Sequence, residues 1–468
     1  MEKQYLKLAG EYLTGRYDPD LTDIECGRNK YDFLVDSIVP SERLAISGKG
    51  ALIITSHGNL IDFQSMTVNC ILGQNDPWVK LQQIAYLISN RPSFHTTKLG
   101  SELYYSLPRR LVELRVGGIS EAVVSHRQSN GSDAMEHAVK AASIRHPHRK
   151  GLVSFRGSYH GQNMTAYAIS DIQSRHRFLS NTPTVTYFPA PNSADRLDGD
   201  ACLTINEAAE LDQLDMMGQD VFAVVVEPIQ MNNGVQPFSS IFLKALRDIC
   251  TKRDICLIFD EIQTGIGWLG YLTAAELIGV VPDMIALSKA LTAGNGPLAL
   301  TITSQSYKSM EYGTASKTNG ADVRSLVAAH AVLDRLLGLP DELIPDFIEG
   351  QLRYELQTGL LNAIPSLSEK LRRHAEAIVT EFSCILGMPR GYGLICGLPI
   401  IGSNGKADPD LASKISNECF ERGLFLRTSG PSCLLIKVPA VISDKQLDDG
   451  FNILRDSILA VNLTKKTA

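Results

Sequence analysis

The sequence predicts an α/β protein built on a mostly parallel central sheet flanked by helices in a large domain, with a smaller α/β domain. Apolar runs typical of buried strands alternate with helical patterns along the middle of the chain. This alternation favours right-handed crossovers and therefore a parallel sheet with helices on both faces. The chain has 468 residues, 44% hydrophobic and 21% charged, which is enough apolar area for more than one core.

The strands of the central part are predicted from runs that are apolar throughout, as expected of strands covered on both faces. These runs are residues 151–155, 221–228, 256–260, 284–288 and 298–303. Between them, residues 133–145 and 240–253 show apolar side chains at helical spacing. Ligands of such sheets bind beyond the carboxyl ends of the strands. Asp260 and Lys289 both stand at such ends.

The chain is predicted to divide into three parts. Residues 1–75 form an N-terminal segment that packs with the small domain, residues 76–340 the large domain, and residues 341–468 the C-terminal small domain. The division is based on a change in the sequence pattern near residue 341, where long helical patterns lead into short apolar runs. In the first part, residues 51–63 hold two short apolar runs around a His-Gly-Asn turn.

Composition and charge argue against several classes of protein. The net charge is −6 and no basic block stands out, which disfavours a nucleic-acid partner. The apolar runs are too short to span a bilayer, and the first twenty residues lack the apolar core of a signal peptide. The nine cysteines are scattered without a C-x-x-C pair, which favours reduced thiols and no metal site. We therefore expect a cytoplasmic protein without membrane contact.

Two adjacent acids, Asp260 and Glu261, follow the apolar run at 256–259. A buried charge costs several kcal/mol unless a partner meets it, so a positive partner is expected. Lys289 follows the next predicted strand and is one candidate. On these residues alone, a structural ion pair is the favoured interpretation.

Two further features point toward a ligand. Asn130, Gly131 and Ser132 precede a predicted helix, where small residues leave backbone N–H groups free to hold an anion. The alternative is a plain helix cap made by Ser132 or by the following Asp133. Tyr159 and His160 lie in a Gly-flanked turn after a predicted strand. The alternative there is an ordinary loop aromatic.

One cofactor would use all of these features. Pyridoxal 5′-phosphate (PLP) carries a phosphate for the helix N-terminus and a flat ring for Tyr159. Its ring nitrogen, when protonated, would be the positive partner of Asp260, and its aldehyde would condense with Lys289. A Schiff-base lysine and an acidic partner of the pyridine nitrogen are the signature of proteins that bind this cofactor.

Residues of roughly 40 to 460 resemble the class-III, fold-type I PLP-dependent aminotransferases. The resemblance is carried by "VVVEPIQMNNGVQP" and by the long stretch "CLIFDEIQTGIGWLGYLTAAELIGVVPDMIALSKALTAGNG". In that stretch Lys289 follows Asp260 by 29 positions, as the family pattern expects. A pattern of this length with ordered partners is far more specific than a lone short motif.

The resemblance implies a role for each candidate residue. Lys289 would form the Schiff base and then act as the general base, and Asp260 would hold the pyridine nitrogen. Thr318 would reach the phosphate bound by the neighbouring subunit, which implies a homodimer with shared active sites. The other implied cofactor contacts are Gly131 and Ser132 at the phosphate, Tyr159 stacked on the ring with His160 beside it, Gln263 at the phenolic oxygen, and Glu227 near the cofactor edge.

Several positions depart from the family pattern. Asn130 stands where a Ser is usual, and "TNGADV" replaces the usual T-x-G-G-N-P around Thr318. Many members carry an Arg that grips the α-carboxylate of the amino acid, where this chain has Ile436 with Lys437 beside it.

Arg427, in "GLFLRTSG", locally resembles diaminopelargonate synthase, in which an Arg at that place meets a substrate carboxylate. The paired tryptophans expected near the substrate of that enzyme are not seen in "DFQSMTVN", so its substrate is not assigned. The alternative for Arg427 is a solvated surface side chain.

The predicted activity is an aminotransferase that moves an amino group between an amine donor and a keto acid or aldehyde by a ping-pong mechanism. The missing Arg favours an ω-amine, a diamine or an amine of a specialised pathway as donor. A decarboxylase, racemase or aminomutase of the same fold would share the cofactor machinery. A non-catalytic PLP-fold binding protein is the remaining alternative, although it would have no need to retain Lys289.

Overall fold

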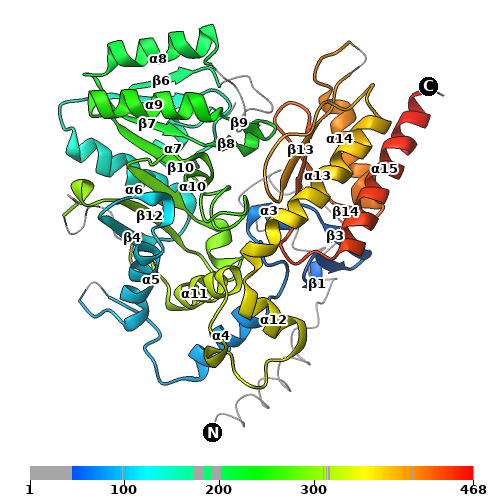
Figure 1. The fold of residues 1–468 in the computed structure, drawn as a ribbon, viewed down its shortest axis with the longest axis horizontal. Coiled ribbons are helices and arrows are strands. Elements are labelled where there is room, and N and C mark those ends of the chain that lie inside the picture. Colours follow the sequence, from blue (N-terminus) through cyan, green and yellow to red (C-terminus); the bar gives the residue numbers. More distant parts are fainter. Residues whose placement is uncertain are drawn as a thin grey trace, which may run out of the picture.

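The computed structural model describes residues 45–96, 98–171, 184–190, 202–308, 310–311, 314, 317–402 and 404–466. Its central sheet has the strand order β4-β12-β11-β10-β7-β5-β6 (Figure 1). The strands are β4 (Ala122–Gln128), β5 (Gly151–Phe155), β6 (Thr184–Phe188), β7 (Val221–Val226), β10 (Cys256–Asp260), β11 (Met284–Leu287) and β12 (Ala299–Ser304).

The middle of this sheet is parallel. β10 pairs in parallel with β7 and β11, and β5 pairs in parallel with β6 and β7. β12 runs antiparallel to both β11 and β4. The reversal follows from the short connection between β11 and β12, because a parallel neighbour would need a crossover of a dozen or more residues. The predicted mostly parallel sheet flanked by helices is confirmed.

Both faces of the sheet are buried, and β10 shows how. Leu257 and Phe259 belong to one apolar cluster together with residues of α9 (Ser240–Arg253). Cys256 and Ile258 belong to a second cluster, with residues of α6 (Gly131–Arg145). Successive side chains of a strand point to opposite faces, so a strand between two helical layers must be apolar throughout.

The remaining helices lie around this sheet and over the C-terminal part (Figure 1). They are α3 (Ser65–Val68), α4 (Pro77–Ile88), α5 (Glu102–Glu113), α7 (Met164–Ala168), α8 (Ile205–Met217), α10 (Ala274–Ile278), α11 (Val323–Leu337), α12 (Gly350–Thr358), α13 (Ile364–Glu381), α14 (Pro409–Glu421) and α15 (Asp444–Lys466).

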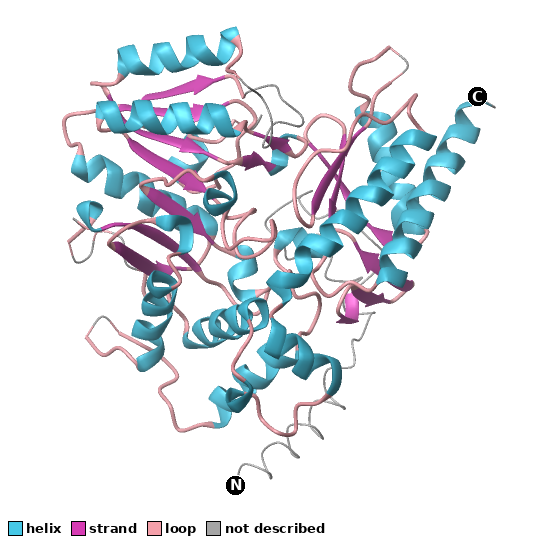
Figure 2. Ribbon diagram, viewed as in Figure 1, coloured by secondary structure: helices cyan, strands magenta, loops and turns pink. Residues whose placement is uncertain are grey.

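Among the described residues, two smaller sheets lie beside the helices α13 to α15, and a third, two-stranded one follows closely on β7 (Figures 1 and 2). Their strand orders are β1-β2-β3-β14, β13-β16-β15 and β8-β9. These strands are β1 (Ala45–Lys49), β2 (Leu52–Thr55), β3 (Gly58–Asp62), β8 (Ile229–Gln230), β9 (Gln236–Pro237), β13 (Ile395–Pro399), β14 (Leu424–Phe425), β15 (Arg427–Ser429) and β16 (Cys433–Lys437).

The first strands of the described chain join its C-terminal part. β3 pairs in parallel with β14, so that Leu424 lies opposite Ile61 and Phe425 opposite Asp62. This pairing supports the division at residues 75 and 340, which stays a prediction. Residues 1–44, which belong to the predicted N-terminal segment, lie outside the described residues.

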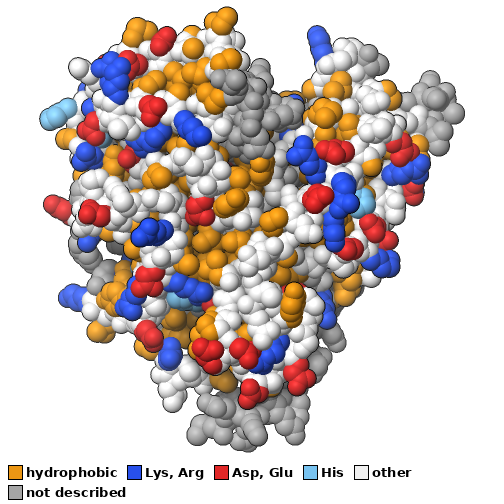
Figure 3. Space-filling view, viewed as in Figure 1, with side chains coloured by type: hydrophobic (Ala, Val, Ile, Leu, Met, Phe, Trp, Pro, Cys, Tyr) orange, Lys and Arg blue, Asp and Glu red, His pale blue; other side chains and the backbone are white. Residues whose placement is uncertain are grey.

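The surface of the molecule carries charges of both signs. On the face shown in Figure 3, Lys and Arg side chains are interspersed with Asp and Glu. Within the part of the chain that the structure describes, every helix is too short or too polar to cross a membrane.

Candidate active site

A pocket of about 600 Å³ opens at the carboxyl edge of the central sheet. Eight of the residues predicted from sequence line it, and they come from strand ends and loops far apart in the chain. They are Gly131, Ser132, Tyr159, His160, Asp260, Gln263, Lys289 and Arg427. Glu227 and Thr318, which were also predicted, do not line this pocket.

Lys289 follows β11 after Ser288 and is the first residue of a short 3₁₀ helix, Lys289–Thr292. Its φ of 46° is left-handed, a conformation that costs a non-glycine residue energy and that collects at functional sites. It makes no hydrogen bond or ion pair with any residue the structure describes. Burial lowers the pKa of Lys289 to about 8, against the opposing charges of Asp260 and Glu227 and with a small contribution from Arg427.

Asp260, the last residue of β10, has a partner that the chain itself supplies. Its Oδ2 lies 2.8 Å from Nδ1 of His160, and both side chains are buried. Its Oδ1 accepts a hydrogen bond from the backbone N–H of Ile262 at 3.1 Å. The imidazole therefore fixes one carboxylate oxygen, and both His160 and Asp260 line the pocket. The sequence placed His160 in this site but did not predict its contact with Asp260.

The second of the paired acids, Glu261, has a structural role. Its carboxylate accepts hydrogen bonds from the backbone N–H groups of Ala274, at 2.5 Å, and Ala275, at 2.9 Å. These groups belong to the first turn of α10, where N–H groups lack intrahelical partners. Burial raises the pKa of Glu261 to about 7, while these two N–H groups lower it. The two adjacent acids thus serve different purposes, one at the pocket and one at a helix end.

The N-terminus of α6 opens onto the same pocket. Asn130 is the cap residue, and its side chain accepts from the N–H of Asp133 at 3.0 Å. The predicted alternative, a cap made by Ser132 or Asp133, is therefore wrong. Because Asn130 also accepts from Ala134 N–H through its carbonyl, the N–H groups of Gly131 and Ser132 are the ones left for an anion.

Gly131 is required where it stands. A Cβ added there would lie 2.7 Å from Cδ1 of Ile262, closer than packed side chains allow. The absence of a side chain keeps this end of the helix open to a ligand. Ser132 Oγ accepts from the N–H of Gln162 at 3.1 Å, which leaves its hydroxyl hydrogen available.

Glu227 lies behind the pocket wall, one residue beyond β7. It is buried, and its Oε1 accepts from the backbone N–H of Tyr159 at 2.8 Å. Burial raises the pKa of Glu227 to about 7, with His160 lowering it and Asp260 raising it. Its contact holds the loop of Tyr159, a half-buried side chain that itself lines the pocket.

Thr318 lies in an exposed turn outside the pocket. The preceding Lys317 reaches α6, since its Nζ lies 3.6 Å from Oδ1 of Asp133 and its carbonyl accepts from Arg127 at 3.1 Å. The turn is thus held beside the N-terminus of α6 while the side chain of Thr318 faces outward, where another molecule could meet it.

Arg427 and Lys437 share one face of the sheet β13-β16-β15. Arg427 pairs with Leu435, and Lys437 lies two residues further along β16, so the three side chains point the same way. Arg427 lines the pocket and forms no ion pair with the described residues. Lys437 is fully buried and its Nζ has no hydrogen-bond partner among them. Burial lowers the pKa of Lys437 well below its ordinary value, and the charges of Lys289 and Arg427 lower it further.

The structure adds residues that sequence analysis missed. Thr67 and Asn69 line the pocket beside Lys289, although they lie in and just after α3, which follows the N-terminal strands. Asn232, which follows β8, also reaches it. Nothing in their local sequence marks them, because only the pairing of distant segments brings them to this edge.

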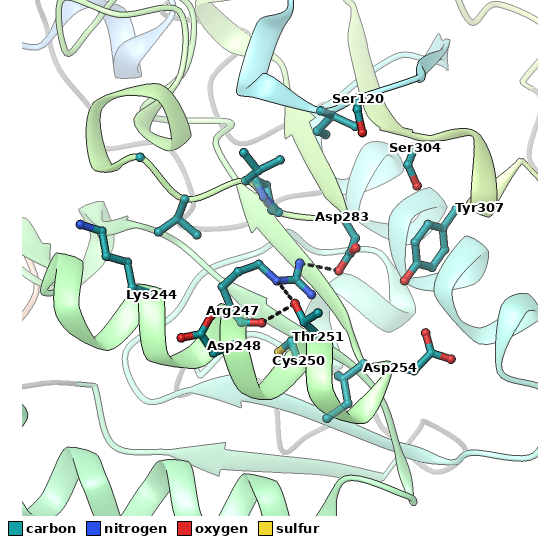
Figure 4. A pocket seen from close by; sticks show the side chains of 16 residues that line it. Ser120, Lys244, Arg247, Asp248, Cys250, Thr251, Asp254, Asp283, Ser304 and Tyr307 are labelled. Atoms are coloured by element: carbon teal, nitrogen blue, oxygen red, sulfur yellow. Dashed lines mark hydrogen bonds and ion pairs between the residues drawn. The ribbon is translucent and has the colours of Figure 1, made fainter.

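A second hollow, of about 540 Å³, lies at the opposite, amino edge of the sheet (Figure 4). Its central charge is already paired. Arg247 Nη1 lies 2.7 Å from Asp283 Oδ2, and Arg247 Nε donates to Thr251 Oγ1 at 3.0 Å. A hollow whose cation is neutralised from within offers little to a ligand. The pocket with the free lysine is therefore the candidate active site.

This fold, with a free lysine and an acid at neighbouring strand ends and an open helix N-terminus, defines a PLP-dependent enzyme. The pattern of the family described as aminotransferase class-III matches residues 40–458. The chain therefore belongs to the class-III aminotransferases, and it is a PLP-dependent transaminase.

Known relatives are similar over most of the chain. The 4-aminobutyrate aminotransferase GabT of Escherichia coli (strain K12) is 30% identical, over 70% of this chain and 72% of its own. The alanine/serine racemase of Pyrococcus horikoshii is 29% identical, over 70% of this chain and 68% of its own. In fold, the chain is similar to the PMP-bound form of an aminotransferase from Vibrio fluvialis, with a TM-score of 0.78, 19% identity, and coverage of 92% and 97%.

Proposed function

We propose that the pocket binds PLP through the residues that line it and transfers an amino group from a specialised amine to a keto acid or aldehyde. The fit rests on observations of this chain. The N–H groups of Gly131 and Ser132 are open to a phosphate, and Lys289 has no partner among the described residues. Tyr159 and Gln263 line the pocket beside them and would contact the ring and its phenolic oxygen.

When bound, PLP supplies an aldehyde carbon for the amine nitrogen and a ring that accepts electrons. The chain supplies the proton transfers. An ε-amine with a pKa near 8 can both give and take a proton near neutral pH, so Lys289 is the general base and acid at the substrate carbon. Asp260, fixed by His160, would hold the protonated ring nitrogen of the cofactor. Glu227 acts indirectly, because its carboxylate accepts a hydrogen bond from Tyr159 and so holds the loop of that residue.

The donor is an amine whose distinguishing charge lies away from the reacting nitrogen. Where many relatives carry an Arg for an α-carboxylate, Ile436 is buried and apolar. The free Arg427 instead stands at the pocket wall and would meet a carboxylate or another acidic group. An ω-amino acid fits this arrangement, whereas a diamine or a specialised-pathway amine is proposed only from the missing Arg.

The reaction is proposed to be ping-pong, because a single pocket must receive the donor and the acceptor in turn. We also propose a homodimer in which Thr318 completes the phosphate site of the neighbouring subunit. The support is its exposed position on a turn held beside α6. A cytoplasmic location stays a prediction from the cysteine pattern.

The single observation that carries the proposal is the left-handed Lys289, which has no partner among the described residues and lines one pocket together with Asp260. The test is the visible absorption spectrum of the purified protein with PLP, before and after a panel of amines. A band of lysine-bound cofactor should be present and should be missing in Lys289→Ala. A donor should bleach the band and a keto acid should restore it. A wild-type protein that takes up no cofactor would overturn the assignment of the pocket.

A racemase is the second candidate, and the similarity to an alanine/serine racemase is what favours it. A racemase would invert a chiral amine without any second carbonyl substrate. Incubation of one enantiomer without a keto acid separates the two, because a transaminase stops after one turnover under these conditions. A non-catalytic binding protein would instead keep its biological effect in Lys289→Ala.

A further inference from the structure

One stretch of the pocket wall has a backbone conformation that its residues disfavour. Ser65, Met66, Thr67 and Val68 follow one another with φ values of 46°, 45°, 61° and 72°. These four residues are the segment labelled α3, and because of this backbone we call Ser65–Val68 the left-handed turn. A left-handed backbone is costly for every residue except glycine, and most for β-branched residues such as Thr67 and Val68. Such a run persists only when the surrounding structure holds it.

The left-handed turn carries side chains to the active site. Thr67 lines the pocket, and so does Asn69, which follows the turn. Asn69 also ties the turn together, because its Nδ2 donates to the carbonyls of Met66 at 3.0 Å and Thr67 at 3.3 Å. The position of this part of the wall therefore depends on the turn keeping its shape.

Asp62 stands at the start of the turn and is directed into it. Its Oδ1 accepts from the backbone N–H of Gln64 at 2.9 Å. The backbone N–H groups of Gln64, Ser65 and Met66 and the side chain of Gln74 all lower the pKa of this carboxyl. Consecutive N–H groups that converge in this way form a small anion-binding concavity, filled here by the chain's own carboxylate.

Burying this carboxylate in its ionised form destabilises the folded state. Asp62 is 1% exposed, and its Oδ2 makes no hydrogen bond with the described residues. Burial outweighs the N–H groups and raises the pKa of Asp62 to about 6. The folded pKa lies above the ordinary 3.8, so the ionised carboxyl destabilises the fold at pH values above about 6, and the penalty fades as the pH falls. A buried charge and a strained backbone in one short segment of a pocket wall indicate function more than stability.

We propose that Asp62 is a positioning residue that holds the left-handed turn, and through it Thr67 and Asn69, in the wall of the active-site pocket. The turn is also fixed from the other side, since Ser65 Oγ donates to the carbonyl of Lys437 at 2.7 Å. Asp62 and this contact together hold the N-terminal strands at the site. The kinetic consequence rests on the proposed function, whereas the conformational one does not.

The first test compares Asp62→Ala with Asp62→Asn. Loss of the charged acceptor should raise the KM for the amine donor about tenfold and change kcat less. Asp62→Asn keeps one acceptor oxygen of the same size and should lie between the wild type and Asp62→Ala. In hydrogen exchange, amides of residues 64–69 should exchange faster in Asp62→Ala, with or without turnover.

The second test restores the turn without its anchor. Glycine adopts a left-handed backbone freely, so Met66→Gly added to Asp62→Ala should bring KM and exchange back toward wild type. The control is Glu121→Gly, which relieves a left-handed residue with a φ of 47° at the amino edge of the sheet. It should add stability without restoring KM or the slow exchange.

Each outcome decides the proposal. Unchanged exchange at residues 64–69 in Asp62→Ala, or equal rescue by Glu121→Gly, would overturn it. If Asp62→Ala does not fold, Asp62→Asn alone must show the faster exchange, or the proposal fails. A wild-type protein without amine turnover would refute the proposed function and still leave the exchange measurements to judge the turn.

Discussion

The two hollows of the central sheet make an instructive pair. They differ little in volume, about 600 Å³ at the carboxyl edge and about 540 Å³ at the amino edge. They differ in the state of their charges. Around the amino-edge hollow, Arg247 is paired with Asp283 and Asp254 with Arg145. In the carboxyl-edge pocket, Lys289 and Arg427 form no ion pair with described residues.

The difference teaches that volume alone does not identify a site. Both hollows are made by the same strands, since Asp283 precedes β11 and Lys289 follows it. At the amino edge the half-buried Arg247 and Asp283 satisfy each other and contribute to stability. At the carboxyl edge Asp260 is paired with His160, but Lys289 and Arg427 have no ion-pair partner among the described residues, which is the state expected of groups that await a ligand. Matched substitutions at the two edges can test this contrast.

The largest expected difference concerns the two lysines. Lys289→Ala should lower kcat by about 10³-fold or more, because it removes the general base as well as the covalent attachment of the cofactor. Lys244→Ala, at the exposed rim of the amino-edge hollow, should leave kcat and thermal stability nearly unchanged. Steady-state kinetics on both variants with one amine donor checks this. A large loss of kcat in Lys244→Ala would break the contrast.

Substitution of Asp260 should affect catalysis, whereas substitution of Asp283 should affect stability. Asp260→Asn should lower kcat by about 10²-fold, since a neutral amide cannot stabilise a protonated ring nitrogen. Asp283→Asn should leave kcat nearly intact but lower the free energy of unfolding by about 2 kcal/mol, because Arg247 and the N–H of Leu257 lose a charged acceptor. Urea unfolding and kcat per folded molecule measure the two effects. Equal losses of kcat would contradict the assignment.

Arg427 should affect the choice of substrate. Arg427→Met should raise the KM for 4-aminobutyrate about tenfold and leave the KM for butylamine, which has the same carbon chain without the carboxylate, nearly unchanged. Arg247→Met is the matched control, since it removes an arginine that is already paired. That variant should lower stability and leave the ratio of the two KM values unaltered. An equal change in KM for both amines in Arg427→Met would show that this side chain does not bind the carboxylate of the substrate.

The smallest effect is expected in the pH dependence of the reaction between the Lys289 amine and PLP. Lysine reacts as the free amine, so a folded pKa near 8 places the rise in reactivity about there and not near the ordinary 10.5. The rate of PLP uptake by cofactor-free protein, measured against pH, should therefore rise through about pH 8. The charge of Arg427 lowers this pKa, so Arg427→Met should move the midpoint upward. A wild-type midpoint near 10 would mean that the lysine is not desolvated.

Much of the fold could be read from periodicity. The run at 256–260 and the helix at 240–253 have in the structure the bounds that the sequence predicts, because their patterns are long and uniform. β4 and β6 were not predicted, since "AVVSHRQ" and "TVTYF" mix polar and apolar residues near the sides of the sheet. The antiparallel direction of β12 was also missed, although the short connection between the predicted runs 284–288 and 298–303 could have indicated it.

The active site divides in the same way. The positions of Asp260 and Lys289 at the ends of apolar runs predicted their place in the site, and the positions of Gly131 and Ser132 at a helix start did the same. The partner of Asp260 lies 100 positions away, in His160. Glu261 stands beside Asp260 in the sequence without an assigned role, and its hydrogen bonds from the N–H groups of Ala274 and Ala275 give it a structural one.

By itself, then, the sequence determined five strands of the central sheet, the candidate acid and lysine of the site, and, through resemblance in one long motif, the family to which the chain belongs. Local periodicity suffices for the strands because it depends on neighbours along the chain, and the length of the motif makes the resemblance specific. The tertiary structure alone decided which charges are paired, which acid faces the pocket, and how Asp62 holds a disfavoured turn against it. Those depend on burial and on hydrogen bonds between distant segments, whose free energies exist only once the segments have packed together.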